Sequence, residues 1–317
     1  MKPAHWANAR VGCIGVSLWF GVAIVLAVPG CSLIPKGDKA MRDAQIDQQH
    51  ERSHGEARVA VAMGAAGPRL SELWQSGSAK AFLPKGAPQE VIFLNTSGGL
   101  TGGDRLALSL EVGAGLHFTG TTQTAERAYA SVSGCAEVQV NLTVGAHAHL
   151  DWLPQETLIY QASALKRETT VALAPSATCL LCETLILGRH AMRETVTRAQ
   201  LQDRRLVLRA GRPVWAEALA LTETSLAARQ NPALLAGAQC CATVALIAPG
   251  AEDAAQALRP LLAAEGCETS LSAWDGRAIL RLRAAEGWPL RRQLARILGQ
   301  LRGRPLPRVW QMNGDLA

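Results

Sequence analysis

Aromatic residues are scarce in this sequence, and the nucleophile motif of the common serine hydrolases is missing. Phe, Trp and Tyr together make up 4% of the 317 residues, so apolar packing must rest on Leu, Val, Ala and Ile. No G-x-S-x-G elbow occurs. Ser, His and Asp are present, but nothing in their spacing singles out a catalytic triad. The sequence therefore gives no positive indication of an enzyme.

Charged residues make up only 18% of the chain, and they are not gathered in the way that nucleic-acid binding requires. The formal net charge is +6. In the densest basic stretch, residues 281–304, Arg alternates with Leu and Ile at helical spacing, which favours a solvated helix face. Apolar residues make up 48% of the chain, enough to bury a substantial core. We expect a folded protein with no nucleic-acid partner.

Eight cysteines lie at irregular positions. Cys179 and Cys182 have the C-x-x-C spacing of redox and zinc sites, but the residues around them are typical of a strand. An offset of three along a strand puts two side chains on opposite faces, so these thiols cannot share an ion or form a bridge. The side chains of adjacent Cys240 and Cys241 would also lie on opposite faces of a strand, so these two thiols cannot share an ion or form a bridge either. We interpret all four as small buried residues of a protein in a reducing compartment.

Residues 95–106 hold four glycines between two apolar runs and raise the question of a phosphate-binding loop. A Walker loop needs a Lys and a hydroxyl residue after its last glycine, and a helix must follow. Here Gly103 is followed by Asp104, whose charge would repel phosphate. Residues 106–112 then alternate between apolar and polar or small residues, which indicates a strand. We therefore predict a glycine turn that joins two strands.

Residues 1–40 differ from the rest of the chain. Positions 11–28 are apolar and uncharged and follow two basic residues, which is typical of a signal peptide or a short membrane span. The residues before Cys31 partly resemble a lipoprotein cleavage box, and a real segment of this kind would mean export and tethering. Met41, in contrast, would be a natural start for a soluble protein. The residues alone leave open whether 1–40 belongs to the protein or only 41–317 does, as a single domain.

Three stretches of the first half resemble one another and predict the fold class. They begin at Val112, Val144 and Leu173, at spacings of 32 and 29 residues, and each has a strand, a turn of small residues and a second strand. Such units suggest stacked coils or sheet layers. We predict a mainly β fold of stacked layers, either β-helix-like or a sandwich. About two α-helices are expected in the C-terminal part, at residues 251–266 and 289–303.

Polar residues that alternate with apolar ones on a strand are the first candidates for chemistry. His147, His149 and Asp151 would share one strand face, and the repeat places His117 at the position of His149, so that the two rings could stack. Two histidines and a carboxylate can hold a transition metal. The favoured interpretation is nevertheless a solvated strand face with incidental histidines.

Carboxylates that recur in or just after the repeated strands are the second candidates. Glu183 and Glu217 lie inside apolar runs, and Glu126 and Glu156 follow strands. Each is either on an exposed strand face, which is the default, or in an internal cavity. In a cavity a carboxylate would be costly unless it were paired, hydrated or bound to a cation.

Five phrases in order resemble the urease accessory protein D family, called H in some bacteria. They are Gly-Gly-x-x-Gly-Gly-Asp from Gly98, Thr-Gln-x-x-Glu-Arg-x-Tyr from Thr122, Trp-Leu-Pro-Gln-Glu from Trp152, Leu-x-Leu-Gly-Arg from Leu185, and Leu-Pro-Arg-Val-Trp from Leu306. The residues that carry the family signature, with an expected structural role, are Gly98, Gly99, Gly102, Gly103, Asp104, Gln123, Arg127, Tyr129, Trp152, Pro154, Gln155, Gly188 and Arg189.

The resemblance implies a urease maturation factor without catalytic activity. Family members are β-rich scaffolds that assemble with accessory protein F and the GTPase G, dock on apo-urease and help to insert nickel. By this resemblance no cofactor is bound tightly, Ni²⁺ binds transiently, and Glu183, Glu217, Glu156 and Glu126 would line its path. The implied location is the cytoplasm, which favours Met41 as the start and a membrane contact only if 1–40 is real. The alternative function is a membrane-tethered extracytoplasmic β-solenoid binding module.

Overall fold

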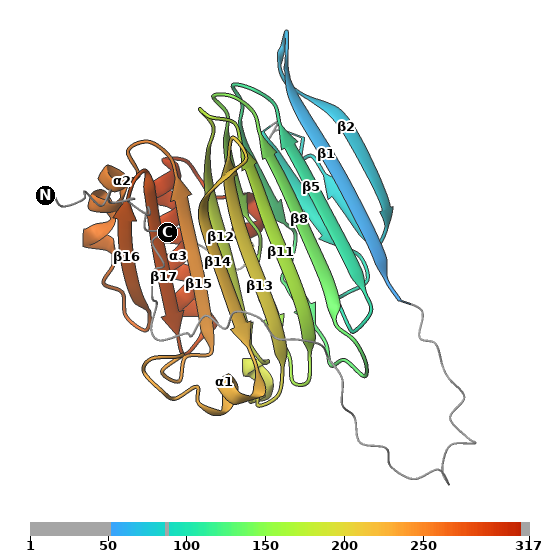
Figure 1. The fold of residues 1–317 in the computed structure, drawn as a ribbon, viewed down its shortest axis with the longest axis vertical. Coiled ribbons are helices and arrows are strands. Elements are labelled where there is room, and N and C mark those ends of the chain that lie inside the picture. Colours follow the sequence, from blue (N-terminus) through green and yellow to red (C-terminus); the bar gives the residue numbers. More distant parts are fainter. Residues whose placement is uncertain (1–51, 86–88, 312–317) are drawn as a thin grey trace, which may run out of the picture.

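Alternation of apolar and polar residues builds the first of two β-sheets. The computed structural model describes residues 52–85 and 89–311. In β8 (Ala136–Val144) every second side chain is buried and the others are exposed, as expected for a strand with one face on the core. The sheet has the strand order β14-β13-β11-β8-β5-β1-β2 (Figure 1). The other bounds are β1 (His54–Gly64), β2 (Gly67–Gly77), β5 (Arg105–Val112), β11 (Ala164–Leu173), β13 (Gln200–Arg209) and β14 (Arg212–Leu221).

The second sheet lies between the first sheet and the helices, and its central strands are therefore apolar on both faces. Its main path has the order β16-β17-β15-β12-β9-β6-β4-β3, and two short strands, β7 and β10, pair beside it. All but two residues of β12 (Thr178–Leu187) are buried. The other bounds are β3 (Ala79–Phe82), β4 (Glu90–Asn95), β6 (His117–Thr122), β7 (Glu126–Ala128), β9 (His149–Leu153), β10 (Thr157–Ile159), β15 (Cys240–Ile247), β16 (Glu268–Trp274) and β17 (Arg277–Ala284).

The expected repeat is confirmed as coils that pass from one sheet to the other. Arg105 of β5 pairs in parallel with Glu137 of β8, which pairs with Lys166 of β11, so the spacings of 32 and 29 residues recur as the strand register. The turns between the sheets stack as well, because Gly145 N donates to Val112 O at 2.8 Å. The prediction of stacked β-layers is thus correct.

Helices cover the outer face of the second sheet near the C-terminus (Figure 1). In the described part of the chain there are three: α1 (Glu223–Ala227), α2 (Ala251–Leu258) and α3 (Gly287–Arg302). The first is a single turn, and its buried Leu226 packs into the core between the two sheets. α2 ends before the expected Gly266, because Pro260 lies in the 3₁₀ turn that follows and cannot donate a backbone hydrogen bond. α3 ends as predicted, with Gly303 at φ 59°.

Two apolar cores result, one between the sheets and one between the second sheet and the helices. Cys179 lies in the first core and Cys182 in the second, which confirms that an offset of three separates the two thiols. Both thiols are free, and burial raises the pKa of each to about 12, so neither is a ready nucleophile.

The interpretations of residues 1–40, including the apolar run at 11–28, Cys31 and the start at Met41, lie outside the described residues. Within residues 52–85 and 89–311, no helix is both long and apolar enough to cross a membrane.

Candidate functional site

The glycine block is a turn between β4 and β5, and its aspartate stabilises the turn. Asp104 is 5% exposed and accepts the backbone N–H of Ser53 and of Thr101, each at 2.8 Å. Gly99 has φ 148°, and a Cβ there would lie 2.3 Å from the ring of Tyr129. The loop therefore has the geometry of a tight turn held by a carboxylate, as predicted.

Gln155 and Trp310 of the signature phrases lie at the contact between the second sheet and α3, whereas Trp152 lies in the core between the two sheets. Trp152 is buried and donates its Nε1–H to Glu183 at 3.3 Å. Gln155 accepts a hydrogen bond from Arg291 of α3 at 2.9 Å. Trp310, from the last phrase, donates to the backbone carbonyl of Leu153 at 3.0 Å. The two phrases are thus joined in space, although 157 residues separate Leu153 from Trp310.

The remaining signature residues shape loops and turns. Gly188 has φ 77°, and a Cβ there would lie 2.8 Å from the carbonyl of Glu194. Arg189 pairs with Glu194 at 2.7 Å, and its guanidinium lies over the ring of Tyr160. Tyr129 meets Tyr160 edge to face at 5.4 Å. Gly98 and Gly103 adopt positive φ, and a Cβ on Gly102 would collide with its neighbours. Pro154 is buried, Arg127 in β7 is half-buried, and Gln123 is exposed.

Glu183 is not on a surface, although surface placement was the default interpretation. It is 4% exposed and faces the space between the sheets, where its carboxylate lies 2.8 Å from Arg167 of β11. Arg167 also donates to Asp203 of β13 at 2.7 Å and 3.0 Å. Burial raises the pKa of Glu183, and the guanidinium of Arg167 opposes that rise. A buried ion pair therefore replaces the expected solvated group.

Glu217 continues this buried network at the other side of β13. It accepts from Arg205 of β13 and from Arg281 of β17, both at 2.7 Å, so it links the two sheets. Arg205 also pairs with Asp203. Burial acts to raise the pKa of Asp203, but the charges of Arg167 and Arg205 lower it well below its usual range. Three carboxylates and three guanidiniums thus balance one another in the network.

Glu126 and Glu156 do not take part in this network of ion pairs. The carboxylate of Glu126 accepts from Asn95 at 3.2 Å, at the end of β4, and burial raises its pKa. The carboxylate of Glu156 points to the helix layer and pairs with Arg291 of α3 at 2.5 Å. Their backbones are neighbours, since Glu126 N donates to Glu156 O at 2.9 Å. Of the four carboxylates expected to line a path, Glu183 and Glu217 therefore share one network, whereas Glu156 points to the opposite face of the second sheet.

The arginine and aspartate partners were not among the candidates found in the sequence. A signal was present: Leu201, Asp203, Arg205 and Val207 alternate with exposed residues along β13, so period two puts them on the buried face together. Ionic residues at inward positions of a strand indicate an internal network, because an unpaired buried charge would be too costly.

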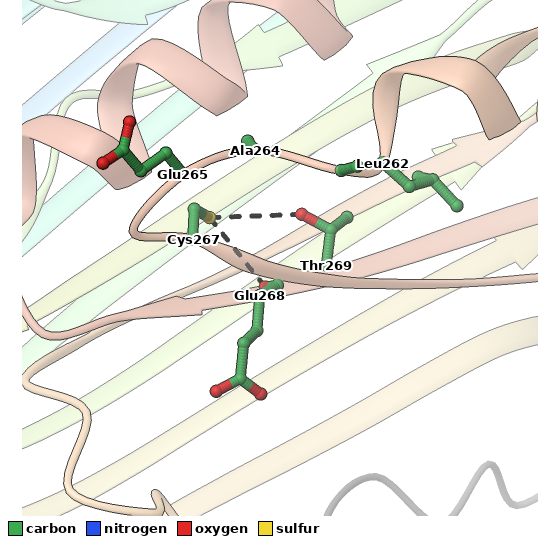
Figure 2. Close-up of a pocket in the computed structure, with 7 residues that line it drawn as sticks. Leu262, Ala264, Glu265, Cys267, Glu268 and Thr269 are labelled. Atoms are coloured by element: carbon green, nitrogen blue, oxygen red, sulfur yellow. Dashed lines mark hydrogen bonds between the residues drawn. The ribbon is translucent and has the colours of Figure 1, made fainter.

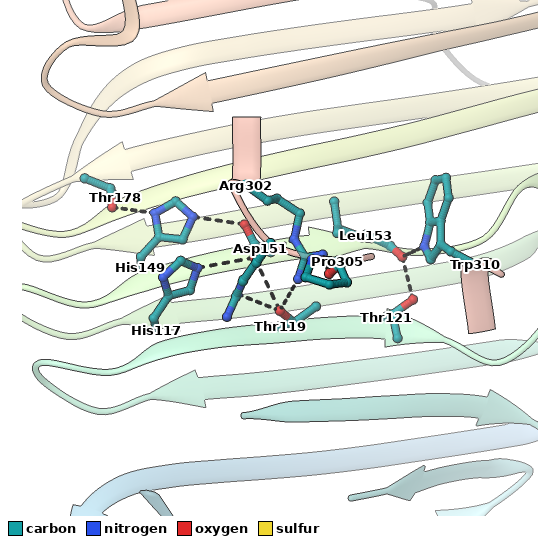
Figure 3. A network of polar contacts seen from close by, with 11 residues as sticks. His117, Thr119, Thr121, His149, Asp151, Leu153, Thr178, Arg302, Pro305 and Trp310 are labelled. Carbon is teal, nitrogen blue, oxygen red and sulfur yellow. Dashed lines mark hydrogen bonds and ion pairs between the residues drawn. The ribbon is translucent and has the colours of Figure 1, made fainter. Parts of the chain in front are cut away.

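The face that carries the histidines is more enclosed than expected. Asp151 is fully buried, and its Oδ1 lies 3.0 Å from His149 Nε2 while its Oδ2 lies 3.4 Å from His117 Nε2 (Figure 3). Oδ2 also accepts from Arg302 at 3.0 Å and from Arg304 at 2.5 Å, so the end of α3 is tied to β9. The interpretation of this face as solvated with incidental histidines is therefore wrong for Asp151.

Burial acts to raise the pKa of Asp151, but the two histidine hydrogen bonds lower it. The charge of Arg302 adds to this lowering, and the pKa lies well below its usual range, so the carboxylate is ionised. The His117 and His149 rings lie 4.4 Å apart on neighbouring layers, as expected, but their planes are tilted by 59° and are not stacked in parallel. His147 does not join them, because it lies in the turn before β9 with φ 56°. In the part of the chain that the structure describes, His117, His149 and Asp151 are the group whose ligand atoms converge, within 4.8 Å of one another.

Two further features do not form a site. A shallow hollow lies between the 3₁₀ turn η3 (Arg259–Leu261) and β16. There Cys267 donates to Glu268 O at 3.9 Å and lies 4.0 Å from the hydroxyl of Thr269, and no set of metal ligands from the described residues converges on the hollow (Figure 2). Residues 50–54 spell H-E-x-x-H, the pattern of zinc peptidases, which binds metal only when a helix carries both histidines. His54 begins strand β1, and His50 and Glu51 lie outside the described residues.

Comparison with known proteins gives one consistent result. The family model of the UreD urease accessory protein matches residues 53–311. A urease accessory protein UreD of Cereibacter sphaeroides is 54% identical over 263 residues, which are 82% of this chain and 96% of the relative. The UreD proteins of Paracoccus denitrificans and Rhizobium leguminosarum bv. trifolii are 48% and 43% identical and cover 86% of this chain, with 97% and 100% of their own lengths matched.

Proposed function

This chain belongs to the UreD urease accessory protein family, and we propose that it matures urease as a scaffold in complex with accessory proteins F and G. The match over residues 53–311 carries the proposal, since it spans nearly all of the described chain. In this complex the GTPase G supplies the nucleotide chemistry, and nickel is inserted into apo-urease. The chain itself acts in the cytoplasm, catalyses no reaction and holds no tight cofactor.

The positions of the signature residues support a scaffold. Gln155 and Trp310 join the second sheet to α3, and the glycine block with Asp104 fixes a turn. None of these contacts assembles a nucleophile with a base or a cluster of donors for a developing oxyanion. A protein that works by binding partners needs residues that shape its surface and does not need reactive groups.

Nickel would pass the chain transiently, with Glu183, Glu217, Glu156 and Glu126 as oxygen ligands. Each carboxylate already has a partner, an arginine in three cases and Asn95 in the fourth. A nickel ion would have to displace a guanidinium at each arginine-paired step. Such competition would keep the ion weakly bound, which suits transfer rather than storage.

Deletion of the gene in its host, followed by complementation, tests the function. Without the chain, urease subunits should accumulate at normal levels but lack nickel and activity, and a plasmid copy should restore both. Immunoblots of the subunits and metal analysis of purified urease give the readout. Normal nickel content in urease from the deletion strain would refute the proposal.

The complex is tested separately by co-expression with accessory proteins F and G. A tag at the C-terminus of this chain should retain both partners, directly or through one another. Fractionation of the same cells tests the location, which we expect to be the soluble fraction. Recovery in the membrane fraction without F or G would favour the tethered binding module instead.

A further inference from the structure

We propose that His117, His149 and Asp151 bind one divalent transition-metal ion of borderline softness, in the class of Co²⁺, Ni²⁺ and Zn²⁺. The three residues come from the adjacent parallel strands β6 and β9, on the face of the second sheet that is turned toward the helix layer. Glu183 lies on the opposite face of that sheet, so this site is separate from the carboxylate network. It goes beyond the proposed role in maturation and does not depend on it.

The ligand atoms already have the spacing that such an ion needs. Metal–nitrogen bonds of about 2.0–2.1 Å put neighbouring ligand atoms about 3.0–3.4 Å apart. His149 Nε2 and Asp151 Oδ1 are 3.0 Å apart, and His117 Nε2 and Asp151 Oδ2 are 3.4 Å apart. One ligand atom from each of the three residues lies within 4.8 Å of the other two, so these atoms must draw somewhat closer to share one ion.

The strand register fixes this arrangement. His117 and His149 are direct partners in the β6–β9 ladder, and Asp151 lies two residues further along the same face. Side chains on strands are held more precisely than those on loops, which favours a preformed site. His147 is not part of the proposed metal site, because it lies in an exposed turn, although it is only two positions from His149.

Groups around the ligands orient them in the way that metal sites require. Thr178 Oγ1 lies 2.7 Å from His149 Nδ1, the ring atom turned away from Asp151 (Figure 3). In the neutral tautomer that carries its hydrogen on Nε2, His149 donates to Asp151 and accepts the hydroxyl hydrogen of Thr178. With metal, the ring proton lies on Nδ1 and is donated to Thr178, which leaves Nε2 free for the ion. A hydroxyl serves both states because it can donate and accept.

Charge and access set the kind of ion and the strength of binding. Two imidazoles and one carboxylate match Co²⁺, Ni²⁺ and Zn²⁺, while Ca²⁺ and Mg²⁺ prefer oxygen ligands alone. Arg302 and Arg304 hold Asp151 Oδ2, which orients the carboxylate and also lowers its attraction for a cation. The His117 side chain is 42% exposed, so an ion can enter from solvent and water can complete its coordination. The site therefore suits reversible loading.

Titration of the purified full chain with Co²⁺ tests the site. The affinity tag is removed first, and the visible absorption of bound Co²⁺ is followed with isothermal calorimetry in parallel. We expect one equivalent to be lost in His117→Ala and in His149→Ala and retained in His147→Ala, the matched control in the neighbouring turn. Thr178→Val should keep the equivalent but weaken it by about 10–100-fold, the effect typical of groups behind a metal ligand.

Circular dichroism and melting curves establish that each variant is folded. Any metal bound elsewhere in the chain is unaffected by these substitutions, so only the difference between variants counts. Equal stoichiometry and affinity in the wild type and in a His117→Ala, His149→Ala double variant would overturn the proposal. Because the titration uses this chain alone, a negative result leaves the role in urease maturation untouched, and loss of that role leaves this result untouched.

Discussion

Asp203→Asn removes the charge that holds two buried arginines while keeping the shape of the side chain. The Asp203 carboxylate is fully buried and accepts from Arg167 at 2.7 Å and 3.0 Å, and from Arg205. Its partners are 5–7% exposed and cannot turn to water. The substitution leaves two guanidiniums with fewer counter-charges in a medium of low polarity, and breaking such a pair costs about 3–5 kcal/mol.

The expected loss is large enough to measure in a thermal melt. A loss of 1 kcal/mol lowers the melting temperature of a chain of this size by about 2–4 °C, so we expect a decrease of roughly 6–20 °C. The matched control is Glu56→Gln on β1 of the same sheet, where the Glu56–Arg58 pair at 3.0 Å has 42% and 48% of its side chains exposed. That pair contributes at most about 1 kcal/mol.

The pH dependence gives an independent check with a defined sign. The pKa of Asp203 is lower in the folded chain than its usual value, so the folded state binds the proton less readily than the unfolded state. Its contribution is complete above the unfolded pKa of about 3.9 and is lost as the pH falls toward the folded pKa. The difference in unfolding free energy between wild type and Asp203→Asn should be constant between pH 7 and 5 and shrink below about pH 4.

A second substitution separates the charge effect from a general loss of packing. In the Asp203→Asn background Arg205 keeps Glu217 as a partner but has lost Asp203, so Arg205→Gln should cost less there than it costs in the wild type. Two results would show that the network does not stabilise the fold in this way. One is a decrease in melting temperature for Asp203→Asn that is no greater than the decrease for Glu56→Gln. The other is a double variant whose loss of stability equals the sum of the two single losses.

Two other predictions concern the proposed nickel path and the glycine block. A Glu183→Gln, Glu217→Gln double variant should lower urease activation while the complex still assembles in a pull-down, because the oxygen ligands lose their charge; full activation would defeat the path. Gly102→Ala should destabilise the fold by about 1–3 kcal/mol in urea unfolding, since the new Cβ would lie 2.0 Å from Ser131 Oγ. Gly299 lies in α3 with open space around it, so Gly299→Ala should instead stabilise the fold by up to about 1 kcal/mol. If Gly299→Ala destabilised the fold as much as Gly102→Ala does, a clash of the new Cβ would not explain the effect at Gly102.

Local patterns determined most of the fold. Period-two alternation, such as that of residues 136–144, specifies strands because each strand buries one face, and this holds whatever its neighbours are. The repeat spacings of 32 and 29 residues specified the coils, because each unit can bury its face only against the next one. Gly303 marked the end of α3 for an equally local reason, its positive φ.

Tertiary structure alone decided which charges meet. Arg291 lies 135 residues from Glu156, and Arg302 lies 151 residues from Asp151, and no periodicity links them. The side chain of a carboxylate on a strand can be placed on one of two faces from the pattern, but whether that face meets solvent, the first sheet or a helix depends on how the layers pack. His147 shows the limit within a single strand: alternation put it beside His149, yet the backbone turns at φ 56° and takes it out of the sheet. Burial makes an unpaired charge costly, so each buried charge needs a partner. Which residue becomes that partner depends on how the layers pack, and the local sequence does not specify it.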